Sequence, residues 1–495
     1  MFREGFDNDK YRKLQSQKIK ERISLFGERL YLEFGGKIFD DFHASRVLPG
    51  FAPDSKIKML IELKDDAEII VSINAEDIEK NKVRGDLGIT YDHDVLRHID
   101  AFRGYGLFVS AVVMTRYTAS PAAEAFKTKL ENLGLKVYKH YDIPGYPHNI
   151  PLIVSEEGYG KNEYVEATRS IVVVTAPGPG SGKMATCLSQ IYHESKMGRK
   201  SGYAKFETFP IWNLPLSHPV NLAYEAATAD LADVNMIDHF HLEAYNTLAV
   251  NYNRDVEVFP VLHSMLKGIL GECPYKSPTD MGVNMAGFCI YDDDAVCDAA
   301  KQEILRRHYN ALCDRRKGSS NDAEIDKIEL LMQKLSISAE NDRKCVDAAL
   351  IKAEQTGAPA VAIELDDGRI VTGKTSSLLG ASSAALLNAI KAVAGIPDAM
   401  DVISPEVIEP IQKLKTAYLG NHNPRLHTDE ILVALSVSAV NNPCAKMAFE
   451  AIPKLKYAEA HSTVILSQID AATFRKLGMN LSCEPQYQTK KLFHR

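Results

Sequence analysis

The sequence lacks the features that mark membrane-spanning, secreted and disulfide-stabilised proteins. Its longest apolar runs, such as residues 107–114, are far too short to cross a lipid bilayer. The N-terminal segment is charged throughout and has no apolar stretch of the kind found in secretion signals. The eight cysteines include no pair at the two-residue spacing typical of zinc and redox sites. We therefore expect a cytoplasmic protein with reduced thiols and no membrane partner.

The sequence also lacks an excess of positive charge. Its 58 Lys and Arg residues are outnumbered by 65 Asp and Glu residues, which gives a formal net charge of -7. A nucleic-acid backbone binds basic surfaces, so nucleic acid is not expected as a partner, whereas a homo-oligomer is compatible with the composition. The 495 residues, 45% hydrophobic and 25% charged, suffice for about three globular domains at roughly 100–200 residues per domain.

The first 217 residues alternate between strand and helix patterns. Apolar residues at helical spacing predict an opening helix over 9–26, and strands are predicted at 58–63 and 68–73. Two strand–helix–strand units follow, in which a serine–proline pair starts one helix and glycines end both. Their elements are predicted at 107–114, 122–133, 135–138, 170–175, 183–197 and 203–208. Two consecutive units of this kind predict an α/β fold with a doubly wound parallel sheet over residues 1–217.

The remaining sequence divides into two further predicted parts. Residues 218–345 are mainly helical in pattern, and residues 346–495 form a predicted C-terminal α+β domain. The latter opens with a hairpin around the turn sequence Asp366-Asp367-Gly368. The hairpin strands, the helix after them and two later strand–helix pairs are predicted at 361–365, 369–372, 382–393, 431–451 and 462–477. The many Ser, Ala and Asn residues of this domain indicate either close packing or a second ligand surface.

A glycine-rich loop at 176–182 carries the strongest functional signal. It follows the apolar run 172–174, reads Ala-Pro-Gly-Pro-Gly-Ser-Gly, and leads into a predicted helix. Phosphate binding requires inward-pointing backbone N–H groups, glycines that let the chain curl, a helix N-terminus and a flexible cation. The residues that supply these features are Gly178, Gly180, Ser181, Gly182 and Lys183. The loop therefore predicts, as partner, a small phosphorylated ligand.

The loop departs from a Walker A sequence at two positions. Pro177 stands where the leading glycine is expected, and Met184 stands where a serine or threonine would bind magnesium. Thr186 offers a later hydroxyl, in an order that somewhat resembles the loops of small nucleotide kinases but lies one residue further on. We predict ATP or GTP with Mg²⁺ as cofactors, and Thr186 as part of the site. A purely structural glycine turn is the alternative.

A dinucleotide-binding turn is a second alternative, since it also joins a strand, a glycine-rich loop and a helix. Its fingerprint, counted from Gly178 and Gly180, requires glycine or alanine at position 183, where a lysine stands. Glu207 at the end of the next strand has the chemistry to bind a ribose. It lies 29 residues after Gly178, however, rather than roughly 20.

Nucleotide chemistry usually needs a further carboxylate that positions magnesium. Asp292 follows the strand-like run 286–291 and is the predicted metal ligand, although the structural alternative is strong, because Asp294 directly precedes the predicted helix and would serve as its cap. The acidic and histidine residues between 238 and 243 do not match a zinc motif, because alternate spacing separates the histidines on a helix. Arg254 and Lys276 are further cations on polar segments that are candidates for phosphate binding.

Three segments carry a family resemblance. They are 173–183 (VVTAPGPGSGK), 209–215 (FPIWNLP) and 277–287 (SPTDMGVNMAG). They resemble an uncharacterised bacterial family, uncharacterised protein family 0371, also named domain of unknown function 1846, and the likeness covers nearly the whole chain. The resemblance implies a multidomain α/β architecture with a helical middle. It implies no substrate or catalytic residue, because none is established for that family.

These features favour a nucleotide-binding enzyme that carries out phosphoryl transfer or nucleotide-driven ligation. The alternative is a non-catalytic protein that uses the same loop for a phosphorylated metabolite or a dinucleotide. The missing hydroxyl after Lys183 is consistent with this alternative. Turnover of a nucleotide distinguishes the two, and the sequence assigns no catalytic residue.

Overall fold

The computed structural model describes residues 3–84, 88–231, 233–319 and 322–489 of a chain that forms two compact units. The unit that we call the sheet unit consists of residues 5–225 and 232–297. The unit that we call the C-terminal unit consists of residues 1–4, 226–231 and 298–495. The three-part division at 217 and 345 stays a prediction.

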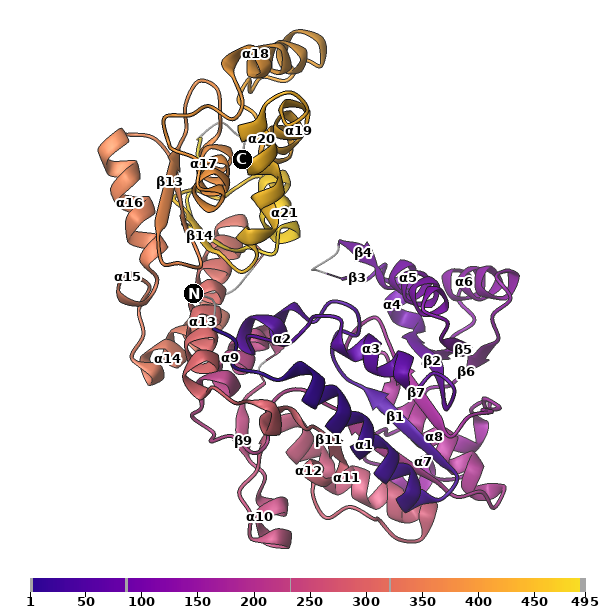
Figure 1. Ribbon diagram of the computed structural model, residues 1–495. Coiled ribbons are helices and arrows are strands. Elements are labelled where there is room, and N and C mark those ends of the chain that lie inside the picture. The colour runs from indigo at the N-terminus through magenta and orange to yellow at the C-terminus, as the bar shows by residue number, and fades with distance from the viewer. Residues whose placement is uncertain (1–2, 85–87, 232, 320–321, 490–495) are drawn as a thin grey trace. The chain divides into compact units, whose positions relative to one another are not determined.

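A seven-stranded sheet, parallel throughout, forms the centre of the sheet unit (Figure 1). Its strand order is β11-β8-β1-β7-β2-β5-β6. The strands are β1 (Arg29–Phe34), β2 (Ala67–Asn74), β5 (Phe108–Thr115), β6 (Val137–Lys139), β7 (Ile171–Thr175), β8 (Ser201–Phe206) and β11 (Gly282–Val283). All residues of β2 and β7 are buried, as expected for central strands with helices on both faces. The predicted parallel sheet is confirmed, and β1 is an additional strand that we did not predict.

Helices cover both faces of this sheet. Successive strand residues point to opposite faces, so Ile69 and Ile70 of β2 belong to different cores. The core of one face includes residues of α1 (Asn8–Phe26), α3 (Ser55–Glu62), α5 (Tyr91–Gly104) and α6 (Pro121–Asn132). The core of the other includes residues of α7 (Ile150–Ile153), α8 (Lys183–Lys196) and α11 (Asn253–Leu270). The sheet is therefore wound on both sides.

The chain leaves the neighbouring strands β1 and β7 toward opposite faces of the sheet. After β1 it passes through α3 to β2, whereas after β7 it passes through α8 to β8. In open parallel sheets, ligands bind outside the carboxyl ends of the strands at the point where such connections diverge. The glycine-rich loop 176–182 follows β7 directly and lies at this point.

Three predicted strands are wrong. Residues 58–62 lie in α3, residues 286–289 form the 3-10 helix η3 (Ala286–Cys289), and the run after 431 lies in α19 (Thr428–Ser438). Short apolar runs fit a buried helix as well as a strand, and periodicity alone does not decide between them. At the start of α19, the backbone N–H of His427 donates to Glu430 at 2.7 Å, which stabilises the helix start.

The segment predicted as mainly helical also contributes strands to the sheet unit. β11 pairs with β8, and β9 (Asn235–Ile237) pairs with β10 (Val250–Tyr252) in a hairpin. The other elements of this unit include α2 (Phe42–Val47), α4 (Ala75–Glu79), β3 (Val83–Arg84), β4 (Ile89–Thr90), α10 (His239–Tyr245) and α12 (Pro278–Met281). α9 (Pro219–Ala227) and α13 (Asp293–Lys317) each continue into the C-terminal unit.

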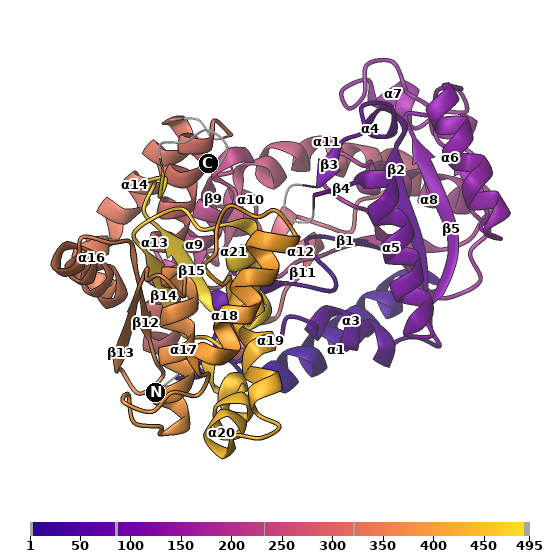
Figure 2. The same cartoon turned by 90° about the horizontal axis from the view of Figure 1, so that it is seen from above.

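The C-terminal unit is built on a separate mixed sheet of four strands, in the order β13-β12-β14-β15. The strands are β12 (Ala360–Glu364), β13 (Ile370–Lys374), β14 (Glu459–Ser462) and β15 (Asn480–Cys483). The predicted hairpin is β12 with β13. Figure 2 shows α16 (Lys344–Thr356) on one side of this sheet and α17 (Ala381–Ala394) on the other. The remaining helices of this unit include α14 (Asp322–Leu335), α18 (Pro405–Lys413), α20 (Pro443–Ala451) and α21 (Gln468–Lys476).

The cysteines and the apolar character of the helices bear on two expectations from composition. All eight cysteines are free, as expected from their spacing. Across the described ranges, no helix combines the length and the apolar character that a bilayer crossing requires.

Candidate functional site

The loop between β7 and α8 turns through two glycines in the left-handed region. Gly180 and Gly182 both have φ of 79°. A Cβ atom on Gly182 would lie 2.8 Å from Cγ2 of Thr115, whereas one on Gly180 would meet nothing within 4 Å. Gly178 packs so closely on Tyr91 that a side chain there would overlap the tyrosine ring. Packing therefore requires two of the glycines, and the loop is open at Gly180.

Polar residues at the ends of neighbouring strands hold this loop in place. Thr115, the last residue of β5, donates from Oγ1 to the carbonyl oxygen of Ser181 at 3.0 Å. Asn74, the last residue of β2, donates to the carbonyl oxygen of Gly180 at 3.5 Å. The buried Ser181 hydroxyl donates to the carbonyl oxygen of Gly178 at 3.0 Å. The Ser181 hydroxyl thus stabilises the loop. The carbonyl groups of Gly180 and Ser181 are turned toward the sheet.

The start of α8 presents backbone N–H groups without partners. Gly182 occupies the cap position without a side-chain hydrogen bond, and the first helical bond runs from Thr186 N to Gly182 O at 2.9 Å. Within the described residues, the N–H groups of Lys183, Met184 and Ala185 donate no hydrogen bond. Such groups carry the partial positive charge of the helix start, which favours an anion there.

Lys183 adds a full positive charge at the same place. Its side chain is half-buried, and its ammonium group forms no ion pair or hydrogen bond with any residue that the structure describes. At the other end of α8, by contrast, Lys196 pairs with Glu156 at 3.1 Å. The Lys183 ammonium group is therefore available to a ligand.

Thr186 lies one turn further into α8. Its side chain is fully buried, and its Oγ1 accepts a hydrogen bond from Ser72 of β2 at 3.2 Å. A ligand that used this hydroxyl would have to displace that contact. The role of Thr186 in a site stays a prediction.

Charged residues lie along the same edge of the sheet, on strands beside β7. Lys205 of β8 forms ion pairs with Glu207 at 2.9 Å and with Asp255, and Glu33 of β1 accepts a hydrogen bond from Tyr203 at 2.7 Å. Burial raises the pKa of Glu207; Lys205 opposes this shift and Asp255 adds to it. β8 is two strands from β7, which is about 10 Å at the usual spacing. This edge therefore combines an anion-binding loop with a carboxyl that takes up protons unusually readily.

Asp292, the predicted metal ligand, lies at the start of α13. Its Oδ1 accepts a hydrogen bond from the N–H of Ala295 at 3.1 Å, which is the geometry of a helix cap. The residues before it form η3 rather than the strand on which the metal interpretation was based. The cap is thus Asp292 rather than Asp294, which lies within α13, and the metal role of Asp292 stays a prediction.

His218, Asp293 and Cys297 form a cluster that the sequence did not reveal. Their potential ligand atoms lie within 4.8 Å of one another, with His218 Nε2 3.0 Å from Asp293 Oδ1. His218 Nδ1 accepts a hydrogen bond from the N–H of Val220 at 3.2 Å, so Nε2 carries the proton. A metal-bound histidine donates from its second nitrogen, which here is an acceptor. The cluster therefore does not fit a metal site.

The other candidates from the sequence have structural partners. Asp238 caps α10 by accepting from the N–H of His241 at 3.0 Å, and Arg254 donates to Asp233 at 2.7 Å. The ammonium group of Lys276 lies 5.6 Å from the ring centre of Tyr245. None of these contacts brings the residues to the loop 176–182.

Three of the residues near the loop that sequence analysis missed lie at or next to the carboxyl end of a strand: Glu33, Asn74 and Thr115. Asn74 and Thr115 end strands that we predicted, so a polar residue at the end of an apolar run was the available signal. Glu33 gave no such signal, because β1 was not recognised. Asp255 comes from α11 and reaches Lys205 only through the fold.

Comparison with known proteins identifies the family. A family model for the N-terminal part of the domain of unknown function DUF1846 matches residues 4–336, and one for its C-terminal part matches residues 341–493. A UPF0371 protein of Streptococcus thermophilus is 56% identical over 495 residues, covering 100% of both chains. A UPF0371 protein of Corynebacterium glutamicum is 58% identical over 492 residues, covering 99% of each. The chain belongs to this family, and the names of these two relatives state no activity.

Proposed function

We propose that this member of the DUF1846 family binds the phosphates of a nucleotide, ATP or GTP, at the start of α8. One observation carries the proposal: N–H groups without partners at a helix start lie beside a lysine, Lys183, that has no internal partner among the described residues. An anion satisfies both at once. The place of the loop, where the connections of β1 and β7 diverge, supports a ligand there.

The reaction that we propose is phosphoryl transfer or nucleotide-driven ligation. Such reactions depend mainly on positioning and on stabilising charge at the phosphate oxygens, which the α8 start and Lys183 would supply. Glu207 would exchange a proton with the substrate, because burial raises its pKa. The proposed reaction and the role of Glu207 depend on the nucleotide site, and an assay of nucleotide turnover tests them.

Magnesium would bind together with the nucleotide at the carboxyl edge of the seven-stranded sheet. Position 184 lacks the usual hydroxyl, but Glu33 lies on the strand next to β7. Its Oε2 accepts from Tyr203, and its Oε1 has no partner within the described ranges. Carboxylate oxygens suit Mg²⁺, so Glu33 is the residue that would hold the ion or its waters. The ion would neutralise charge on the phosphates.

A non-catalytic phosphometabolite- or dinucleotide-binding protein is the second candidate. Two observations favour it: Met184 lacks a hydroxyl, and the Thr186 hydroxyl is engaged with Ser72. Consumption of nucleotide in the presence of a metabolite extract would support the enzyme, and ligand binding without consumption would support this candidate.

Replacement of Lys183 tests the nucleotide site. We expect Lys183→Ala to bind Mg·ATP and Mg·GTP at least about tenfold more weakly than the wild type, because one charge-assisted contact is lost. Isothermal titration calorimetry measures the affinities. Lys196→Ala, on the same helix, is the matched control and should bind as the wild type does. Equal binding by the wild type and Lys183→Ala, or no binding of either nucleotide, would contradict the proposal.

A further inference from the structure

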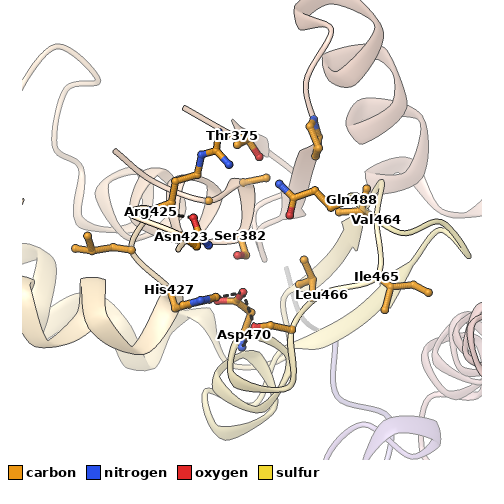
Figure 3. A pocket seen from close by; sticks show the side chains of 15 residues that line it. Thr375, Ser382, Asn423, Arg425, His427, Val464, Ile465, Leu466, Asp470 and Gln488 are labelled. Atoms are coloured by element: carbon orange, nitrogen blue, oxygen red, sulfur yellow. Dashed lines mark hydrogen bonds and ion pairs between the residues drawn. The ribbon is translucent and has the colours of Figure 1, made fainter. Parts of the chain in front are cut away.

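A small cavity lies at the start of α17 in the C-terminal unit. Its volume is about 80 Å³, and its walls include the α17 start, the end of β13, the segment before α19 and the segment between β14 and α21. This volume is well above the roughly 10–15 Å³ that a cavity needs to hold one water, so the space can hold a small polyatomic group such as phosphate. Figure 3 shows Thr375 and Arg425 on one side of it and His427 and Asp470 on the other.

The start of α17 leaves its N–H groups without partners. Gly380 occupies the cap position without a side-chain hydrogen bond. The N–H groups of Ala381, Ser382 and Ser383 donate no hydrogen bond among the described residues. The other two helix starts at the cavity differ, because Asp470 accepts from the N–H of Thr428 on α19, and Ser467 caps α21.

Two hydroxyl groups at the cavity also lack partners. Ser382 is 3% exposed, and within the described residues its hydroxyl forms no hydrogen bond. Oγ1 of Thr375 is likewise buried without a partner. The neighbouring Ser383 is different, since its hydroxyl donates to the carbonyl oxygen of Leu426 at 2.8 Å. Leaving a buried hydroxyl without a hydrogen bond is costly, so Thr375 Oγ1 indicates an absent acceptor, and the Ser382 hydroxyl offers a second donor at the same cavity.

Arg425 gives the cavity a positive charge. Its Nε donates to the carbonyl oxygen of Ser376 at 2.7 Å, and its guanidinium group forms no ion pair with a described residue. The cavity lining includes one carboxylate, that of Asp470, and both its oxygens are engaged. They accept from Thr428, His427 and Ser467. The terminal nitrogens of Arg425 are therefore left for an external anion.

We propose that this cavity binds the phosphate group of a small phosphorylated metabolite. The donors without partners are the N–H groups of the α17 start, the hydroxyls of Ser382 and Thr375, and the terminal nitrogens of Arg425. They exceed what the two oxygens of a carboxylate accept, and they suit the larger oxygen set of a phosphate. This site is separate from the α8 loop and does not rest on the nucleotide proposal.

Inorganic phosphate is the probe that tests this site. To exclude binding at the α8 loop, all proteins carry Lys183→Ala, and calorimetry measures phosphate affinity. We expect Lys183→Ala alone to bind phosphate, and the further changes Ser382→Ala and Arg425→Gln each to weaken binding at least about tenfold. Acetate at the same concentration should not compete, which separates a phosphate site from a carboxylate site.

Ser383→Ala is the matched control, because it removes an adjacent buried hydroxyl that has an internal partner. This variant should lose thermal stability and keep its phosphate affinity, whereas Ser382→Ala should keep its stability and lose affinity. The proposal is overturned if Lys183→Ala binds no phosphate, or if Ser382→Ala and Ser383→Ala bind it equally well. Neither result bears on ATP or GTP binding by the wild type.

Discussion

The starts of α8 and α17 are alike in one respect and differ in how they are assembled. Both helices lack a side-chain cap and leave N–H groups without partners among the described residues. At α8 the loop and the cation, Lys183, are continuous in sequence. At α17 the cation, Arg425, comes from a distant segment of the chain. An anion site of the first kind can be recognised in a sequence, whereas the second kind becomes visible only when the fold brings its parts together.

The two cations also differ in their chemistry. Lys183 is a flexible point charge at an open loop, suited to phosphates of variable position. Arg425 is a planar group whose Nε is fixed by Ser376, so its remaining nitrogens point in a defined direction. This difference favours a larger ligand at α8 and a compact oxyanion at α17.

Replacing glycines should give the largest difference in the free energy of unfolding between the α8 start and the α17 start. Gly182→Ala introduces strain at φ of 79° and a contact with Thr115, so we expect a loss of about 3 kcal/mol in the free energy of unfolding. Gly180→Ala meets no neighbour, so strain alone should cost about 1 kcal/mol. Gly380→Ala, at φ of -67° with its nearest neighbour 3.8 Å away, should change stability by less than about 0.5 kcal/mol.

Urea denaturation of the three variants measures these effects. Similar losses at positions 182 and 380 would show that the α8 loop is not the more tightly constrained of the two helix starts.

The pH dependence of stability should show a smaller effect, which arises from His427 in the lining of the α17 cavity. A hydrogen bond to Asp470 raises the pKa of His427 above 6.5; Glu430 acts in the same direction, and Lys415 opposes it. The stabilising contribution is therefore complete below about pH 6.5 and is lost as the pH rises through the folded-state pKa. We expect the stability difference between the wild type and His427→Gln to fall by about 1 kcal/mol between about pH 6 and pH 9.

Thermal or urea unfolding at several pH values gives this difference curve. Subtracting the variant removes the contribution of other histidines, such as His98 and His140, whose pKa burial lowers to about 4. A flat difference curve would mean that His427 carries no extra proton in the folded protein.

Much of the sheet unit was predictable, because its units carry their own start and stop signals. Ser120 before Pro121 caps α6, and Lys183 follows the loop at the first position of α8, as predicted. β1 was missed because its sequence, Arg-Leu-Tyr-Leu-Glu-Phe, mixes charged with apolar residues. Its charges are explained only by the fold: Arg29 pairs with Glu194, and Glu33 accepts from Tyr203.

The candidate sites were predictable only where neighbouring residues in the sequence form them. Local patterns revealed the α8 loop, but Thr115, which holds it, is far away in the sequence. Asp292 shows the ambiguity of a local pattern, since an acidic residue before a helix suits a metal ligand and a helix cap. The structure shows the cap, and the metal role stays a prediction. For the C-terminal domain, composition left open whether its small residues serve packing or a ligand. Ser383 serves packing, and we assign Ser382 to a ligand.

The most direct test of the account is a crystal structure of the wild-type protein soaked in selenate, a tetrahedral oxyanion whose selenium is located by anomalous scattering. We predict a selenate at the α8 start, with oxygens about 2.7–3.2 Å from the backbone nitrogens of Lys183 and Met184 and from the lysine ammonium group. Selenate bound elsewhere on the protein, with none at the α8 start, would contradict the central claim.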